Sequence, residues 1–276
     1  MNDQNVIEKS LRIIGTLPDG VIDIGEAALL LGALDFPDKD LEPYRAHLTE
    51  LSIAVGRAAE GAETPEQKAA ALGAVLVEDF GYGGDTETYD DMQNANLIRV
   101  IERRKGLPVA LGILCLHMGR SQGWSIAGTY FPSHFLLRLH ESRDPLIIDP
   151  FNGCRVLAVD DLRGLVKKLL GADAAFDMRY CNRIDNRDVL VRLQNNIKIR
   201  AVETGNIERA LEMLSRMTLF SPEHPGLWFE RVILLSRQGQ VKAAIEMAEN
   251  FMAEPAAQPY VPRFQALLNA MRAQLQ

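Results

Sequence analysis

The stretch Arg103-Arg104-Lys105-Gly106-Leu107-Pro108-Val109-Ala110 starts the helix around which we expect the chain to fold. Pro108 holds φ close to the helical value, and its missing N–H costs nothing in the first turn of a helix. Apolar side chains then recur at helical spacing, at Leu111, Leu114, Cys115 and Met118. This pattern predicts a buried helix that begins at Pro108.

Three segments of strand-like composition follow this helix, and Gly, Pro and Ser separate them. They are residues 125–130, 134–139 and 146–149. We expect them to form a small antiparallel sheet, which makes the fold class α+β and mostly helical. His134 then opens the second strand and Asp149 closes the third.

One buried helix followed by such a sheet is similar to papain-like and transglutaminase-like cores. Those cores carry a nucleophile at the helix start, a His on a strand and an Asp on the following strand, the positions of His134 and Asp149. The nucleophile is a thiol whose pKa is lowered by the helix dipole and by a neighbouring imidazole. Here the helix starts with Pro108, Val109 and Ala110, which offer neither a thiol nor a hydroxyl.

Two other thiols need an assignment. Cys115 lies five residues beyond Ala110, or about 140° around the helix axis, so we assign it to the core as a small buried hydrophobe. Cys154 follows the Asp149 turn, and we expect it to be partly exposed and near His134. A structural role is still favoured for Cys154, because no helix N-terminus is evident there to activate it.

Charged residues flank the organising helix. Arg103 and Arg104 either brace the turn before Gly106 or bind an anion, and bracing is favoured. An acidic run precedes them at Asp85, Glu87, Asp90 and Asp91. Its spacing fits no calcium-loop template, so a solvated acidic loop is favoured over a cation site.

Composition excludes several classes of function. The net charge of −7 argues against a general nucleic-acid binder, because neutralising phosphates requires a basic surface. The sequence has neither a secretory leader nor an apolar run long enough to span a bilayer, so we expect a cytoplasmic protein without membrane partners. The three cysteines, Cys115, Cys154 and Cys181, have no paired spacing, and His117 and His140 are isolated. We therefore predict no disulfide framework, no metal and no cofactor.

The chain divides into three predicted parts. Residues 1–85 form an N-terminal helical layer, with helices near residues 25–35, 41–57 and 66–80 and a flexible loop at 81–85. Residues 86–187 form the core, which includes a helix at 159–170. Residues 188–276 form helices at 188–204, 207–220, 225–237, 241–251 and 261–275.

The last part contains a repeat. Gly205 and Ala210 recur as Gly239 and Ala244, each pair 34 positions apart by direct subtraction. This is the tetratricopeptide period, in which Gly serves the turn between helices and Ala their close contact. Trp228 occupies an early packing position in the second repeat. We predict two repeats and a capping helix, with the first repeat docked on the core because two repeats alone are marginal.

Three motifs carry a resemblance to the bacterial SirB-type family, which pairs a transglutaminase-like core with C-terminal tetratricopeptide repeats. They are residues 96–108, residues 131–136 (Phe131-Pro132-Ser133-His134-Phe135-Leu136) and residues 148–153 (Ile148-Asp149-Pro150-Phe151-Asn152-Gly153). The resemblance covers nearly the whole chain and implies the fold, whereas a fold does not fix an activity. It also implies that His134 and Asp149 match the second and third positions of the triad and that Ala110 stands near the position of the nucleophile.

Two functions remain open. The first is a non-catalytic scaffold for a protein or peptide partner, which binds through the repeats and a core groove formed by Arg103, Arg104, Phe131, Pro132, His134 and Phe151. The second is a hydrolase or acyl-transferase that uses His134 and Asp149 with an activated water or Cys154. Ala110 at the helix start favours the scaffold. Ligand sensing under Phe131 and Trp124 rests only on aromatic placement, and a core role for both rings is favoured.

Overall fold

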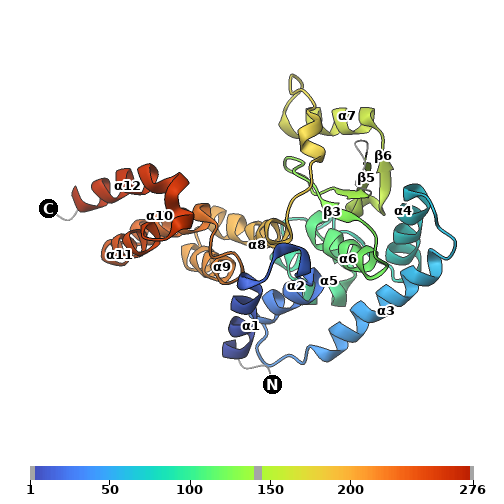
Figure 1. Ribbon diagram of the computed structural model, residues 1–276, viewed down its shortest axis with the longest axis horizontal. Helices are drawn as coiled ribbons and strands as arrows, with labels where there is room; N and C mark the ends of the chain where they lie inside the picture. Colours follow the sequence, from blue (N-terminus) through green and yellow to red (C-terminus); the bar gives the residue numbers. More distant parts are fainter. Residues whose placement is uncertain (1–3, 140–144, 274–276) are drawn as a thin grey trace. The chain divides into compact units, whose positions relative to one another are not determined.

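The computed structural model describes residues 4–139 and 145–273, and His140 lies outside them. The chain forms two compact units (Figure 1). The first comprises Pro18–Leu193 with the start of the chain up to Ile7, and the second comprises Glu8–Leu17 with the chain from Gln194 onward. The division falls within α1 (Gln4–Thr16) and α8 (Asn186–Glu203). As predicted, the fold is α+β and mostly helical with a small antiparallel sheet.

The helices of the first unit follow local sequence signals. Asp23 caps α2 by accepting a hydrogen bond from the backbone N–H of Glu26, and Thr64 forms a capping box with Gln67 at the start of α4. The predicted helix at 66–80 is in fact two pieces, because the last six residues have π-helical geometry. The helices are α2 (Ile24–Ala33), α3 (Glu42–Ala58), α4 (Pro65–Gly73), the π-helix η2 (Ala74–Asp79), α5 (Leu97–Arg103), α6 (Pro108–Ser121) and α7 (Val159–Leu170).

Helix α6 is the centre of the first unit, and it begins at Pro108 as predicted. Every residue from Pro108 to Leu116 is buried. The helix packs against α2, α3, the first strand of the sheet and the short turn η4 (Pro150–Asn152), and Figure 1 shows it beside the sheet. At Gly112 a Cβ would lie 2.4 Å from the ring of Phe135, so only glycine allows that ring to approach the helix.

The main sheet has four antiparallel strands in sequence order, in the register Leu137↔Ile148 for its central pair. The strands are β3 (Ile126–Gly128), β4 (Leu137–Leu139), β5 (Leu146–Asp149) and β6 (Arg155–Leu157). Asp149 ends β5 as predicted. The prediction that His134 opens a strand was wrong, because the chain turns at Ser133, where φ is 55°, and β4 begins only at Leu137.

A second, two-stranded sheet pairs β1 (Gly83–Gly84) with β2 (Lys105–Gly106) in parallel, where we expected a flexible loop. The next residue, Asp85, is 1% exposed, which corrects the interpretation of a solvated carboxylate at this position, whereas Glu87 and Asp90 of the same acidic run are exposed. Its carboxylate accepts hydrogen bonds from Thr88 and pairs with Arg103 at 2.8 Å. Arg103 also donates to Asn94, and so joins β1 to α5 and to the turn η3 (Met92–Ala95).

The second unit contains α9 (Ile207–Phe220), α10 (Pro225–Arg237), α11 (Val241–Met252), the 3-10 helix η6 (Pro255–Tyr260) and α12 (Val261–Ala273). The repeated glycines, Gly205 and Gly239, have φ of 74° and 78°, which a side chain would disfavour. The repeated alanines, Ala210 and Ala244, are fully buried. Trp228 stacks on another ring of the repeat core. No helix in the described part of the chain meets the length and apolarity that a membrane span requires.

The buried pair at β1 is a testable support of this fold. Hydrogen bonds from Thr88, together with one from Arg103, hold the pKa of Asp85 well below its usual range. We expect Asp85→Asn to lower the free energy of unfolding by about 2 to 3 kcal/mol, because Arg103 loses its counter-charge. Urea unfolding followed by circular dichroism measures this loss. Glu87→Gln is the control, since Glu87 pairs with Lys105 at the surface and its removal leaves stability nearly unchanged.

Candidate functional site

An imidazole and a carboxylate meet at the end of strand β5. His134 Nε2 lies 3.1 Å from Asp149 Oδ2, and the two side chains are 13% and 6% exposed. Because Asp149 accepts this hydrogen bond, the Nε2 atom carries the proton and Nδ1 is left as a potential base. Nδ1 makes no hydrogen bond within the described residues. The pair therefore has the arrangement of a base and its orienting acid.

Two more groups fix the carboxylate. The Asn152 side chain donates to Oδ2 at 2.7 Å, and the backbone N–H of Phe151 donates to Oδ1 at 3.0 Å. Burial raises the pKa of Asp149, but the hydrogen bonds from His134, Asn152 and Phe151 outweigh burial and leave the pKa below its usual value. Asp149 is therefore an anion at neutral pH.

Arg192 holds the turn that carries His134. Its guanidinium donates to the backbone carbonyls of Thr129, Phe131 and His134 at 3.0, 3.2 and 2.6 Å. It also lies over the ring of Phe135, 5.3 Å from the centroid. This role could not be predicted from the sequence, because Arg192 is 58 positions from His134 and lies on helix α8. Burial lowers the pKa of Arg192, and the three carbonyls compensate the buried cation.

Aromatic rings cover one side of the pair. The Phe151 ring lies 6.4 Å from the His134 ring and 5.8 Å from the Tyr89 ring, in edge-to-face geometry in both cases. A Cβ at Gly84 would lie 2.5 Å from the Phe151 ring, so this glycine makes room for it. Tyr89 and Gly84 were not among the predicted site residues.

The other residues that were predicted to form the groove make structural contacts. Phe131 is 1% exposed and packs in a core cluster with Tyr180, so its ring does not line an open groove, and that expectation is corrected. Pro132 is half-buried in the turn before His134. Arg103 binds Asp85 and thus acts as a brace.

Arg104 also has internal partners. It ends α5 with φ of 57°, and its guanidinium contacts His47 Nε2 and the hydroxyl of Tyr82. Burial lowers the pKa of His47, and the charge of Arg104 lowers it further. For the Tyr82 hydroxyl, burial acts in the opposite direction and raises the pKa to about 12. This cation therefore braces α3 against the segment before β1.

The three cysteines are buried and free. Ala110 is fully buried at the start of α6. Cys115 is fully buried, as predicted, and Cys154 is only 3% exposed, so the expectation of a partly exposed Cys154 was wrong. The two Sγ atoms lie 3.4 Å apart, because the turn after η4 folds back onto α6. Among the described residues no cysteine sulfur hydrogen-bonds to His134.

These thiols are poorly suited to nucleophilic attack. The hydrogen bond with Cys154 raises the pKa of Cys115, and burial raises it further. Burial also raises the pKa of Cys181, which is 3% exposed and packs in the cluster of Phe131. A thiol with a raised pKa has little thiolate at neutral pH. Nor do the described residues contain a group of three or more His, Cys, Asp or Glu side chains arranged to hold a metal ion.

Comparison with known proteins agrees with this architecture. Residues 42–195 match the model of the transglutaminase-like superfamily, and residues 197–274 match the tetratricopeptide repeat. A UPF0162 protein of Xylella fastidiosa strain 9a5c is 30% identical over 234 residues, which cover 84% of this chain and 83% of that protein. A UPF0162 protein of Vibrio cholerae is 28% identical over 74% of this chain and 76% of its own length. No solved structure matches the chain.

Protein SirB1 of Salmonella typhimurium is 24% identical over 55% of this chain and 56% of its own length. The class that the fold defines is a transglutaminase-like core followed by tetratricopeptide repeats. Within this class, the chain belongs to the SirB-type family, together with the UPF0162 proteins.

The pH dependence of stability tests the His134–Asp149 pair. Because the folded-state pKa of Asp149 is below its usual 3.8, the unfolded chain binds more protons in acid. The stabilisation is complete well above pH 3.8 and is lost as the pH falls through the lower folded-state pKa. We expect the difference in free energy of unfolding between the wild type and Asp149→Asn to be constant near neutral pH and to shrink below about pH 5.

Urea unfolding at a series of pH values measures this difference. The control is Asp173→Asn, since Asp173 is exposed. This control should show no such pH-dependent difference. A difference for Asp149→Asn that stays the same from neutral to acidic pH would contradict the pairing.

Proposed function

We propose that this protein is a non-catalytic, cytoplasmic scaffold of a regulatory kind, built on a degenerate transglutaminase-like core with a tetratricopeptide tail. The observation that carries the proposal is Ala110 at the start of α6, where the chemistry of such cores requires a thiol. A base without a nucleophile to activate has no covalent step to perform.

The positions of the other thiols support this proposal. Cys154, the candidate substitute, is buried and its sulfur contacts Cys115. The imidazole of His134 is instead part of a network with Asp149 and Asn152, which serves to fix the turn after β5. Such a network stabilises the turn after β5, in the same way as it would orient a base in an enzyme.

The partner in this proposal is a protein or a peptide, and it binds through the repeats and the surface around His134 and Phe151. Tetratricopeptide repeats generally mediate contacts between proteins. The net charge of −7 gives no electrostatic reason to expect nucleic acid or an anionic membrane as the partner.

A hydrolase or acyl-transferase is the second candidate. The observation in its favour is the intact His134–Asp149 hydrogen bond with Nδ1 left as a potential base. Either a water molecule activated by Nδ1 or Cys154 would have to replace the missing thiol.

A thiol-directed acyl probe tests whether Cys154 is the nucleophile of an enzyme. We expect the native protein to resist labelling at neutral pH and to be labelled after unfolding in urea, because burial protects both Cys115 and Cys154. Mass spectrometry of peptides identifies the labelled residue. Rapid labelling of native Cys154 that disappears in a folded His134→Ala variant would establish a thiol enzyme instead.

Partner capture tests the scaffold itself. After cross-linking in the native cell, the tagged full-length protein should retain a defined set of partners, and a chain that ends at Leu193 should lose them. This end point keeps Arg192, which holds the turn before His134. Full-length Cys154→Ala should capture the same partners as the wild type, because the buried thiol takes part neither in the binding surface nor in a catalytic step.

Circular dichroism of each variant shows whether it is folded. Loss of capture in folded Cys154→Ala would favour the enzyme, and retention of capture by the shortened chain would place the binding surface outside the repeats. If the full-length protein captures nothing above a tag-only control, the scaffold proposal fails.

A further inference from the structure

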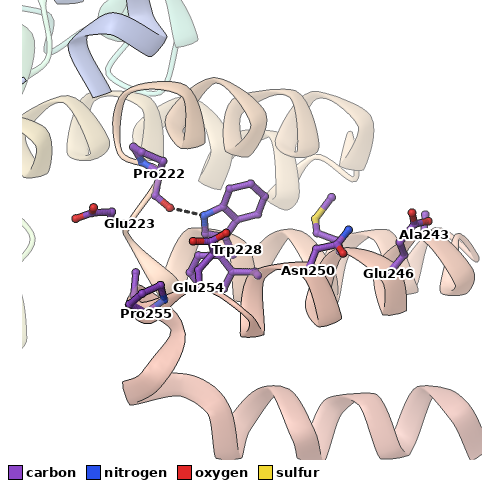
Figure 2. A pocket seen from close by; sticks show the side chains of 11 residues that line it. Pro222, Glu223, Trp228, Ala243, Glu246, Asn250, Glu254 and Pro255 are labelled. Carbon is purple, nitrogen blue, oxygen red and sulfur yellow. Dashed lines mark hydrogen bonds between the residues drawn. The ribbon is translucent and has the colours of Figure 1, made fainter. Parts of the chain in front are cut away.

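A pocket of about 1060 Å³ lies in the second unit. It is formed by one face of α11, by the segment before α10 and by the start of η6, and Figure 2 shows its side chains. The volume is at the upper end of the range for small-ligand pockets, so the pocket has room for part of a polypeptide.

The floor of the pocket is apolar. The indole of Trp228 stacks on the ring of Phe251, with centroids 5.2 Å apart and planes 19° apart, and Met247 lies beside them. Trp228 Nε1 donates to the carbonyl of Pro222 at 2.7 Å, as the dashed line in Figure 2 shows. With its polar atom satisfied, the indole offers an apolar surface to a ligand, and Arg231 Cζ lies 5.8 Å from the centroid of its ring. Met247 is flexible enough to adapt to side chains of different shape.

The rim of the pocket is acidic. Glu223, Glu246 and Glu254 line the pocket and are exposed. Figure 2 places Glu223 and Glu254 toward the prolines and Glu246 toward Ala243 at the other end. None of the three carboxylates has an ion-pair partner within the described residues, and no Lys, Arg or His is among the described residues that line the pocket.

The dimensions fit a short extended segment. The pocket follows α11 from Ala243 to Phe251, and eight steps of about 1.5 Å each give about 12 Å. An extended chain advances about 3.3 Å per residue, so about four residues cover this length. Asn250 is exposed on the same face, and its side-chain amide is available to bond a peptide backbone.

We propose that this pocket binds a short peptide segment of a partner protein in which a bulky apolar side chain is flanked on both sides by lysine or arginine. The apolar side chain packs on Trp228, Phe251 and Met247, and the flanking cations face the carboxylates at the two ends. An acidic segment is repelled by the same rim. This proposal rests on the proposed function as an interaction scaffold and specifies its partner.

Tryptophan fluorescence of the full-length chain tests the proposal. The chain has two tryptophans, so Trp124→Phe leaves Trp228 in the pocket as the single reporter. The probes are three synthetic nine-residue peptides with the same central Leu-Phe pair and with flanks of lysine, serine or glutamate. We expect the lysine-flanked peptide to bind at least about tenfold more tightly than the serine-flanked one, and more weakly as salt is added. The glutamate-flanked peptide should not bind.

Matched variants locate the binding. Glu246→Gln should weaken the lysine-flanked peptide several-fold, whereas Glu208→Gln, an exposed glutamate on α9 outside the pocket, should leave its affinity unchanged. A lysine-rich peptide without the Leu-Phe pair should bind weakly, because the floor then has nothing to bury. Both Gln variants keep the backbone and the side-chain volume, so circular dichroism should show the same fold.

Three outcomes would overturn the proposal: equal binding of the three peptides, tighter binding of the glutamate-flanked peptide, or no effect of Glu246→Gln. Self-association that Glu246→Gln abolishes, measured by light scattering, would also overturn it by making a second copy of the chain the occupant. If the peptides fail while the repeats still capture partners from the cell, the pocket assignment is wrong and the scaffold stands. If capture fails as well, both proposals are wrong.

Discussion

Burial of α6 on all sides is the constraint on which the first unit depends. An amphipathic helix covers one face of a core, whereas a helix that is apolar all round is stable only when other elements surround it. Helix α6 is surrounded by α2, α3, strand β3 and the turn η4. The close approach of Phe135 to Gly112 shows how little space remains. Any change in the position of α6 would therefore displace the turn that follows Asp149.

The His134–Asp149 pair depends on that same packing. Asp149 ends β5 next to α6, and Arg192 holds the turn before β4 by three backbone carbonyls. The result is a positioned imidazole in a unit whose central helix begins with the buried, apolar Ala110 in its first turn. The physical cost of keeping a buried carboxylate is met by hydrogen bonds from His134, Asn152 and the backbone. These bonds explain how the pair keeps its geometry in the buried interior.

In the second unit, the repeated glycines and alanines that pack the helices are not among the residues that line the pocket. The glycines at the 34-residue period serve the turns, and the alanines serve the contacts between helices. Two of the residues that line its pocket are Glu246 on α11, which repeats Glu212 at the same period, and Glu223 before α10, which has no carboxylate at the corresponding positions. A repeat fold can thus keep its core while its surface charge sets the choice of partner.

Local sequence predicted the helices well where caps and periodicity agree. The bounds of α6 at its start, and of α7, α9 and α10, were obtained from Pro108, the apolar spacing and the turn glycines. The strand at 146–149 has its predicted bounds. The strand predicted at 134–139 is shorter than expected, because the positive φ at Ser133 is set by the contacts of the turn with Arg192 and not by neighbouring residues. Asp85 was predicted to be solvated for the same reason: its partner Arg103 is 18 positions away.

The sequence by itself determined the order of elements, the repeat period and the loss of a thiol at the start of α6, since each is a local property of composition and spacing. Only the tertiary structure decided that Cys154 is buried against Cys115, that Arg192 secures the turn of His134 and that one pocket brings Trp228 and Phe251 together with three carboxylates that have no ion-pair partner among the described residues. These features join residues from distant parts of the chain, and distance in space follows from packing rather than from position in the sequence.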